Sequence, residues 1–384
     1  MGCTGDDQPA PDRGRPFLSK EPYVQRVGTG LRLRFETREE IALPVQIEAD
    51  GTLEVIPSLR AAEVTYARDF IEPSDVFFPD EPGLHVVQEA DLGPLEPGRY
   101  RWRIEADVVH EGEFLVPGPE DPLRLGWLAD TSWPESQEVV AMLAGRGPDL
   151  FLHGGDLQYE SNPFDTWSGM SQSLAPITRR AIAHMIVGNH EFEEGEEIEQ
   201  MYDRLYAGQG EGPEGARYFS FRAGAARIIC LDSETGGLDD ESDAQVAWFE
   251  QELARGDAAT TVVAFHRPTY SLSKHYRSDT TFREVIHSRV VDAGVPLVLC
   301  GHAHCYERFD VDGVQYVVDG GGGAVLYDPN EGRTQADAER PGESDMRTVV
   351  SKTRGATTID IAPDGRLTVE RCEPDGTMTD QFSV

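Results

Sequence analysis

The chain has 384 residues, enough for two domains and a large hydrophobic core, and a formal net charge of −35. Such an acidic chain is not expected to bind nucleic acid or an anionic membrane nonspecifically, because both require a basic patch. No apolar run in the sequence approaches the roughly 20 residues that span a bilayer. An anionic small-molecule substrate remains compatible with this charge, since metal ions can invert the local charge of a site.

The first 20 residues are polar and contain several prolines and glycines, a composition that predicts a disordered tether. Cys3 in this segment resembles the lipidated cysteine at the mature start of a bacterial lipoprotein, with the apolar signal segment removed. This interpretation predicts a lipid anchor at Cys3 and export to the periplasm or the cell surface. The alternative is that Met1 is the natural start and that Cys3 has no such role.

Residues 21–117 contain short, regularly spaced strands and no helical periodicity. Leu31–Phe35, for example, alternates apolar and polar residues with period two, as a half-buried strand does. Short strands separated by turn residues are typical of a β-sandwich, and we predict a fibronectin III-like sandwich here. The other expected strands are Val45–Ala49, Leu53–Ile56, Glu63–Tyr66, His85–Gln88, Tyr100–Ile104 and Glu113–Val116.

The proline- and glycine-rich stretch 118–122 is the predicted linker to a second domain over residues 123–384. Beyond it, strands alternate with helices, which indicates a layered α/β domain. Helices are expected over Glu135–Gly145, Asp243–Arg255 and Thr281–Ala293. Residues 327–346 are polar and rich in proline and glycine, and they predict a mobile loop. The alternating segments 357–361 and 367–371 predict two edge strands.

Polar side chains follow five apolar strands of this second domain, at the point where each strand ends. Open α/β sheets place their ligands at the carboxyl ends of strands, so we expect these side chains to converge. Carboxylate, amide and imidazole groups together suit iron, manganese or zinc, and their number exceeds what one tetrahedral ion takes. The sequence therefore predicts two ions that share a carboxylate. The residues are Asp130, Asp156, Asn189, His266, His302 and His304.

The order of these groups resembles the calcineurin-like metallophosphoesterases, and more closely their purple acid phosphatase branch. The motifs that carry the resemblance are Asp130–Ser132, Gly155–Tyr159, Gly188–Glu191, Val263–His266 and Gly301–His304. The resemblance extends from about Glu21 to the C-terminus. It implies a four-layer catalytic domain, in which two mixed sheets are flanked by helices, behind an N-terminal sandwich.

Ser132 departs from the family pattern, because other metallophosphoesterases usually have a histidine ligand at this position and the purple branch usually has glycine. The purple branch instead takes a ligand from tyrosine, and Tyr159 stands in the corresponding place. The alternative for Tyr159 is a core tyrosine near the site.

The resemblance implies two sets of metal ligands. An Fe(III) ion would take Asp130, Asp156, Tyr159 and His304. A second ion, Fe(II), Zn(II) or Mn(II), would take Asp156, Asn189, His266 and His302, so that Asp156 bridges the two.

Two further histidines are implied to act on the substrate. His190 resembles the family's phosphate-contacting histidine, which can stabilise charge or protonate the leaving group. His275 lies where some members carry another substrate histidine, and the alternative is an exposed loop histidine. Glu191 and Arg308 are expected to be structural or to support the ligands.

The resemblance implies a binuclear phosphoesterase that hydrolyses small-molecule phosphate monoesters by in-line attack of a metal-bound hydroxide. One alternative is a phosphodiesterase that acts on a cyclic nucleotide or another diester. Another, of a different class, is a non-catalytic surface binding protein with a vestigial metal site.

Overall fold

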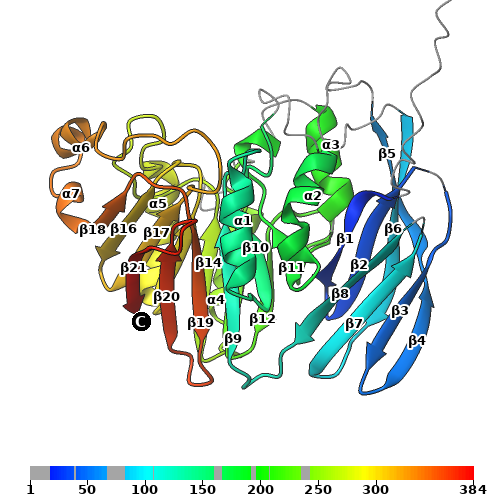
Figure 1. Cartoon of the computed structure of the whole chain (residues 1–384). Helices are drawn as coiled ribbons and strands as arrows, with labels where there is room; N and C mark the ends of the chain where they lie inside the picture. Colours follow the sequence, from blue (N-terminus) through cyan, green and yellow to red (C-terminus); the bar gives the residue numbers. More distant parts are fainter. Residues whose placement is uncertain are drawn as a thin grey trace, which may run out of the picture.

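Three β-sheets form the framework of the chain in a computed structural model (Figure 1). The structure describes residues 18–38, 40–66, 83–106, 108–159, 167–191, 196–206, 208–234 and 243–384. Cys3, and with it the predicted lipid anchor, lies outside these residues. Within them, no helix is long and apolar enough to cross a membrane.

The first sheet has ten strands in the order β21-β20-β19-β9-β10-β11-β1-β2-β6-β5. Its central strands β9, β10 and β11 are parallel, and β19 pairs antiparallel with β9. The sheet is therefore mixed, and three of its carboxyl-terminal strand ends lie at one edge. The strands are β1 (Leu18–Val27), β2 (Gly30–Thr37), β5 (Leu59–Tyr66), β6 (Gly83–Gly93), β9 (Leu123–Leu128), β10 (Leu150–His153), β11 (Ile182–Met185), β19 (Ala356–Ile361), β20 (Leu367–Cys372) and β21 (Met378–Ser383).

The second sheet has seven strands in the order β12-β13-β14-β15-β17-β16-β18. Strands β13, β14, β15 and β17 are parallel, while β12, β16 and β18 pair antiparallel. This sheet packs on the first through a common hydrophobic core, to which Trp127 and Leu152 contribute from one side and Phe221 and Leu299 from the other. The strands are β12 (Phe219–Ala223), β13 (Ala226–Cys230), β14 (Thr260–Phe265), β15 (Leu297–Cys300), β16 (Tyr306–Val311), β17 (Val314–Asp319) and β18 (Arg347–Ser351).

Helices cover the outer faces of both sheets. Helices α1 (Ser136–Gly145) and α2 (Trp167–Thr178) pack on the first sheet and stand in front of it in Figure 1. Helices α4 (Ala244–Leu253) and α5 (Thr280–Asp292) pack on the second sheet. The predicted arrangement of two mixed sheets flanked by helices is thereby confirmed. The remaining helical segments are η1 (Asn189–Glu191), α3 (Glu196–Tyr206), α6 (Arg333–Glu339) and α7 (Glu343–Met346).

The N-terminal region is rich in strands, as predicted, but one of its sheets is not separate from the catalytic sheet. Strand β1 pairs in parallel with β11 through Val24 and Ile182, so β1, β2, β6 and β5 extend the ten-stranded sheet. The four-stranded sheet β4-β3-β7-β8 packs against this extension through buried residues such as Trp102 and Phe35. Its strands are β3 (Pro44–Ala49), β4 (Thr52–Pro57), β7 (Gly98–Glu105) and β8 (Val109–Val116). The fibronectin III-like type and the domain boundaries stay predictions.

The predicted tether over residues 1–20 is wrong for its last three residues, since Leu18–Lys20 are buried in strand β1. The Lys20 ammonium lies 3.0 Å from a Glu36 carboxylate oxygen and donates to the Ser168 hydroxyl of α2 at 2.9 Å. A buried lysine requires such partners. Its partners are distant in sequence, so the local composition gave no sign of this strand.

The predicted linker 118–122 is an ordered turn in the structure. The Gly118 N–H donates to the Asp121 carboxylate at 2.8 Å, and the Asp121 N–H donates to the Gly118 carbonyl at 3.2 Å. A Cβ atom at Gly224, between β12 and β13, would lie 2.7 Å from the Asp121 carbonyl oxygen. The turn thus packs directly on the second sheet.

Two other expectations about the C-terminal region are wrong. Residues 327–346 do not form only a loop, because they contain α6 and α7, which side-chain contacts hold to distant parts of the chain. Glu343, for example, accepts from Arg283 at 3.0 Å and is buried. Neither predicted edge strand lies at an edge: β19 lies between β9 and β20 and is almost wholly buried, and β20 lies between β19 and β21.

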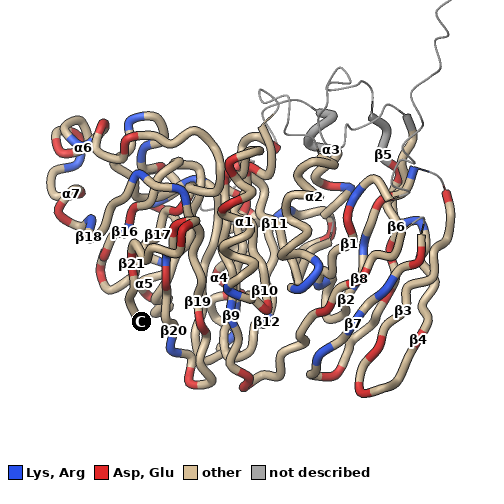
Figure 2. The backbone as a smooth tube through the Cα atoms, viewed as in Figure 1, with Lys and Arg blue, Asp and Glu red and all other residues tan. Residues whose placement is uncertain are grey.

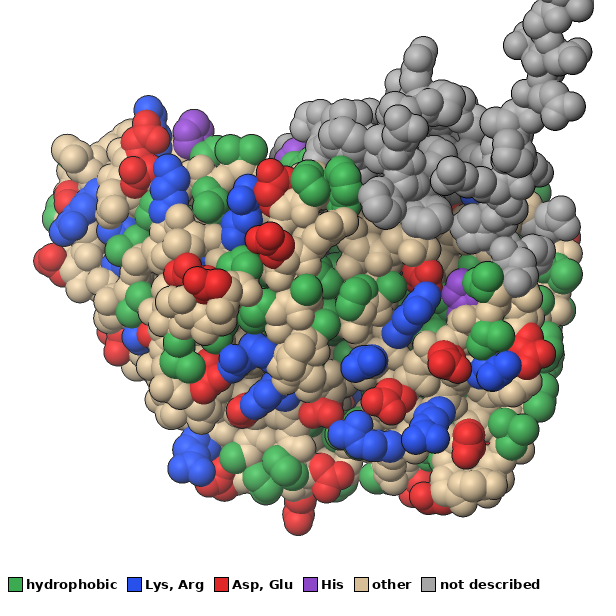
Figure 3. Space-filling view, viewed as in Figure 1, with side chains coloured by type: hydrophobic (Ala, Val, Ile, Leu, Met, Phe, Trp, Pro, Cys, Tyr) green, Lys and Arg blue, Asp and Glu red, His purple; other side chains and the backbone are tan. Residues whose placement is uncertain are grey.

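The large negative charge is spread over the molecule. Figure 2 shows acidic residues along strands and loops throughout the chain, with basic residues interspersed, and the face in Figure 3 carries both signs side by side. Many of these charges are paired, as Arg124 is with Asp360 at 2.6 Å. Surface pairs of this kind contribute little to stability, about 0–1 kcal/mol each.

A buried histidine makes the fold sensitive to acid. His184 lies in the core between the sheets, 4.0 Å from the Phe221 ring, and its ring nitrogens have no hydrogen-bond partner among the described residues. Burial lowers the pKa of His184 from 6.5 to about 3, whereas the unfolded chain binds this proton below about pH 6.5. Protonation of the unfolded state therefore reduces the free energy of unfolding as the pH falls from 6.5 towards 3.

We expect His184→Phe to remove this contribution, which is on the order of several kcal/mol over the full range. Denaturant unfolding at pH 7, 5.5 and 4.5 should show a shallower loss of stability in the variant than in the wild type. Identical slopes for the two proteins would contradict the assignment.

Candidate metal centre

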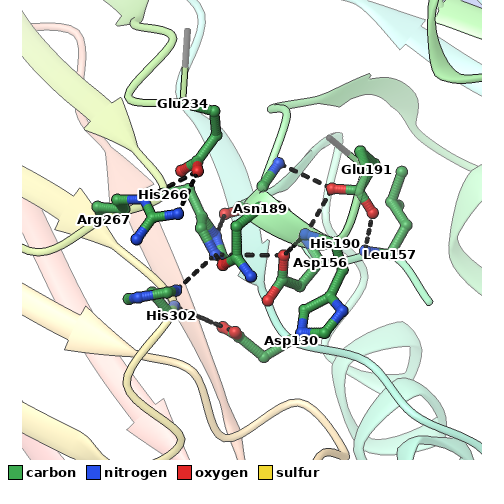
Figure 4. Close-up of polar contacts among 12 residues, drawn as sticks. Asp130, Asp156, Leu157, Asn189, His190, Glu191, Glu234, His266, Arg267 and His302 are labelled. Carbon is green, nitrogen blue, oxygen red and sulfur yellow. Dashed lines mark hydrogen bonds and ion pairs between the residues drawn. The ribbon is translucent and has the colours of Figure 1, made fainter. Parts of the chain in front are cut away.

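The predicted ligands meet where the parallel strands of the two large sheets end. Asp130 and Asp156 follow β9 and β10, and Asn189 follows β11 in the first sheet. His266 follows β14, and His302 and His304 follow β15 in the second sheet. All six side chains are buried, and Figure 4 shows those of Asp130, Asp156, Asn189, His266 and His302 in one cluster. The convergence predicted from strand ends is thus present in the structure.

Three of these residues have an unusual backbone conformation. Asp130, Asp156 and His302 have φ angles of 60°, 53° and 66°, in the left-handed region that costs a non-glycine residue roughly 1 kcal/mol or more. The His302 N–H donates to the Asp130 carboxylate at 2.9 Å, and the Asp130 N–H donates to the Gly155 carbonyl at 3.1 Å. The surrounding hydrogen bonds hold the turns in this conformation and direct the side chains inward.

Gly301 is required next to this cluster. A Cβ atom at this position would lie 2.7 Å from an Asp130 carboxylate oxygen and 2.8 Å from the Ala129 Cβ. Any larger residue would displace the carboxylate.

The first group of donors consists of Asp130, Asp156, Tyr159 and His304. The Tyr159 hydroxyl lies 3.3 Å from a carboxylate oxygen of each aspartate and 3.0 Å from His304 Nε2. Burial, with Asp156 and Asp130 close by, raises the pKa of Tyr159 well above 10. The Tyr159 phenol thus keeps its proton here unless a cation binds the phenol oxygen and replaces that proton.

The second group consists of Asp156, Asn189, His266 and His302. His266 Nε2 lies 3.3 Å from an Asp156 carboxylate oxygen, 3.2 Å from Asn189 Oδ1 and 3.1 Å from His302 Nδ1. Burial disfavours both charged forms, but the mutual attraction lowers the pKa of Asp156 and raises that of His266 to about 10. Asp156 is common to both groups, since its carboxylate lies within 4.8 Å of ligand atoms of Asp130 and His304 in one group and of His266 and His302 in the other.

Backbone carbonyls orient two of the imidazoles. His266 Nδ1 lies 2.8 Å from the Gly154 carbonyl, and His304 Nδ1 lies 2.9 Å from the Val325 carbonyl. A carbonyl can only accept, so each Nδ1 carries a proton, and each Nε2 is the nitrogen that faces the donor group and could bind a cation in place of a proton. Carboxylate oxygens, a phenol and imidazole nitrogens thus face the centres of the two donor groups. These are atoms that bind metal ions, so the arrangement fits one ion in each group.

Glu191 holds the loops that carry Asp156 and Asn189. Its carboxylate accepts from the backbone N–H groups of Asp156 at 2.9 Å, Leu157 at 2.7 Å and Gly188 at 2.7 Å. Burial and the nearby Asp156 raise the pKa of Glu191 to about 8. The expected supporting role of Glu191 therefore rests on contacts in the structure, whereas Arg308 pairs with Asp380 and contacts no predicted ligand.

The two predicted substrate histidines differ in their exposure and in their contacts with the donor groups. His190 is partly exposed, and its ring centroid lies 4.2 Å from that of Tyr159. The backbone N–H of His190 donates to an Asp156 carboxylate oxygen at 2.9 Å. His275 is exposed and makes no described polar contact with the donor groups, although its ring lies 4.7 Å from Tyr327.

Sequence reasoning missed two kinds of residue beside the site. Tyr276 and Tyr327 pack on the ligand imidazoles, with centroid distances of 4.0 Å from Tyr276 to His302 and 4.6 Å from Tyr327 to His304. Arg267 follows His266 and pairs at 2.8 Å with Glu234, whose side chain is 1% exposed. For Tyr276 the one available signal was its position next to His275, and Tyr327 lay in the supposed mobile loop.

Comparison with known families agrees with this geometry. A family model described as calcineurin-like phosphoesterase matches residues 91–306, more than half of the chain. The chain belongs to the calcineurin-like phosphoesterase family. Within this family it is similar to purple acid phosphatases, as the sequence motifs predicted.

Two curated relatives of this phosphoesterase come from Arabidopsis thaliana. Purple acid phosphatase 22 is 29% identical over 247 residues, which cover 61% of this chain and 55% of the relative. Purple acid phosphatase 21 is 28% identical over 269 residues, which cover 64% of this chain and 60% of that relative. The match thus spans just over half the length of these relatives.

Solved structures support the same fold. The purple acid phosphatase PPD1 from yellow lupin (Lupinus luteus) seeds superimposes with a TM-score of 0.75 at 19% identity, covering 94% of this chain and 73% of that one. The structure of PhoD superimposes with a TM-score of 0.64 at 14% identity, and the match covers 97% of this chain and 91% of PhoD. Both structures thus share the fold of nearly the whole chain.

We expect Glu191→Ala to weaken metal binding by roughly 10- to 100-fold, because three backbone N–H groups lose their acceptor and the Asp156 loop loses its support. Glu191→Gln keeps one acceptor oxygen and should weaken binding less. Competition with a chelator, followed by elemental analysis, measures the change. Equal metal affinity in wild type and Glu191→Ala would show that the loops hold without this side chain.

Proposed function

We propose that this chain is a binuclear metal-dependent phosphoesterase that hydrolyses small-molecule phosphate monoesters. The observation that carries the proposal is Asp156, whose carboxylate is common to two groups of buried donors. Family membership and the purple acid phosphatase relatives support the same reaction class.

The donor chemistry suggests a different ion for each group. Asp130, Asp156, Tyr159 and His304 include a phenol and suit Fe(III), while Asp156, Asn189, His266 and His302 suit Fe(II), Zn(II) or Mn(II). Such a pair of ions, when bound, would polarise the phosphoryl oxygens and make a nucleophile available near neutral pH.

The residues around the donors have separate tasks in this proposal. His190 lies at the partly exposed side of Tyr159 and can donate a proton to the departing ester oxygen. Asn189 contributes an amide oxygen directed at His266. His275 lies farther out, beside Tyr327, and we assign it a contact with the organic part of the substrate.

The purified protein tests the proposal through its colour and its activity. We expect two metal ions per chain, hydrolysis of 4-nitrophenyl phosphate, and a visible charge-transfer band from tyrosinate to Fe(III). Tyr159→Phe should abolish the band, because phenylalanine has no oxygen to bind the ion. Absorption spectroscopy with iron quantification measures this.

Asp156→Asn serves as the activity control, and it should lose at least about 100-fold in kcat, since removal of one electrostatic contact at a reacting centre costs roughly that much. A colourless, iron-free but active enzyme would contradict the Fe(III) assignment. Faster turnover of bis(4-nitrophenyl) phosphate than of the monoester would favour the diester alternative. No turnover of either substrate by the metal-loaded protein would favour a binding protein.

A further inference from the structure

An aromatic surface borders the donor groups on the side of the second sheet. It consists of Tyr276 and Tyr327, whose rings are 5.4 Å apart. Tyr276 lies 4.0 Å from the His302 ring and 5.6 Å from the His304 ring, so it spans both donor groups. Both tyrosines are half-buried, which leaves part of each ring accessible beside the site.

The backbone fixes this surface in place. The Tyr327 N–H donates to the His304 carbonyl at 3.0 Å, and the Val325 carbonyl accepts from His304 Nδ1. Burial, with Tyr327 close by, raises the pKa of Tyr276, so its hydroxyl stays uncharged. Preorganised rings of this kind bind a partner at a low cost in conformational entropy.

The neighbouring residues give the surface an apolar character. Val325 is 75% exposed next to it and adds an apolar side chain to its edge. The cations of the adjacent loop already have acidic partners: Lys274 pairs with Glu331 at 2.8 Å, and Arg277 lies 3.8 Å from Glu339. These two cations therefore do not favour a second anionic group on the substrate.

A phosphate bound at the two donor groups would have its organic group on the side away from the buried Asp156. Two partly exposed rings lie next to the donors: His190 beside Tyr159, and Tyr276 beside His302. Tyr276 thus offers the organic group of a monoester a ring surface beside the second donor group.

We propose that Tyr276, supported by Tyr327, selects phosphate monoesters whose leaving group is an uncharged aromatic ring. This inference rests on the proposed phosphomonoesterase function. Aromatic pairs contribute about 0.5–1.5 kcal/mol beyond their buried area, which corresponds to roughly two- to tenfold in kcat/KM.

The test compares 4-nitrophenyl phosphate with β-glycerophosphate, which has an alkyl leaving group. Tyr276→Ala should lower kcat/KM for the aryl ester about two- to tenfold more than for the alkyl ester. Tyr276→Phe keeps the ring and should retain the wild-type ratio. Intrinsic differences between the leaving groups cancel, because each variant is compared with wild type on the same two substrates.

Three controls separate the possible outcomes. Tyr100→Ala, a half-exposed tyrosine on β7, should leave the ratio unchanged. Inhibition by inorganic phosphate should be the same in Tyr276→Ala and wild type, because phosphate has no organic group. Equal losses on both substrates, weaker phosphate inhibition or loss of metal would overturn the selection and assign Tyr276 to support of His302. An unchanged ratio in Tyr276→Ala would also overturn it, while a wild type inactive on both esters would refute the proposed function itself.

Discussion

The structure depends on one constraint: the carboxyl ends of parallel strands from two sheets must meet at Asp156. This carboxylate is buried, accepts the His190 N–H and lies within reach of both Tyr159 and His266. A single anion so placed requires cationic partners, since burial of an isolated carboxylate is very costly. The packing of the two sheets on a shared core places the donors of one sheet against those of the other.

Holding this arrangement has a conformational cost that the rest of the fold offsets. Asp130, Asp156 and His302 occupy left-handed backbone conformations, which persist only where the surroundings determine them. Glu191 and the carbonyls of Gly154 and Val325 supply those surroundings by fixing loops and imidazoles. The segment that contains Val325 and Tyr327 thus orients His304 and also forms the edge of the site.

The sequence predicted the parts of the molecule that local patterns encode. Apolar runs ending in Asp130, Asn189 or His266 identified the strand ends, and the rule for parallel sheets then brought them together. The place of Tyr159 came only from the family resemblance, because a tyrosine after a Gly-Asp motif has no distinctive periodicity. The family comparison agrees with that resemblance.

Features that depend on distant contacts were not predictable in this way. The continuity of the sheet through Val24 and Ile182 joins strands some 160 residues apart, and the burial of Lys20 requires Glu36 and Ser168. Helix α7 depends on contacts such as that between Glu343 and Arg283 rather than on an apolar face. Tyr276 likewise owes its place to the loop after β14, whose path no motif specifies.

Anomalous diffraction from crystals of the metal-loaded protein tests the central claim most directly. The account predicts two anomalous peaks roughly 3.5–4 Å apart on either side of Asp156, one beside Tyr159 and His304 and the other beside Asn189, His266 and His302. A single peak, or a pair not bridged by Asp156, would contradict it.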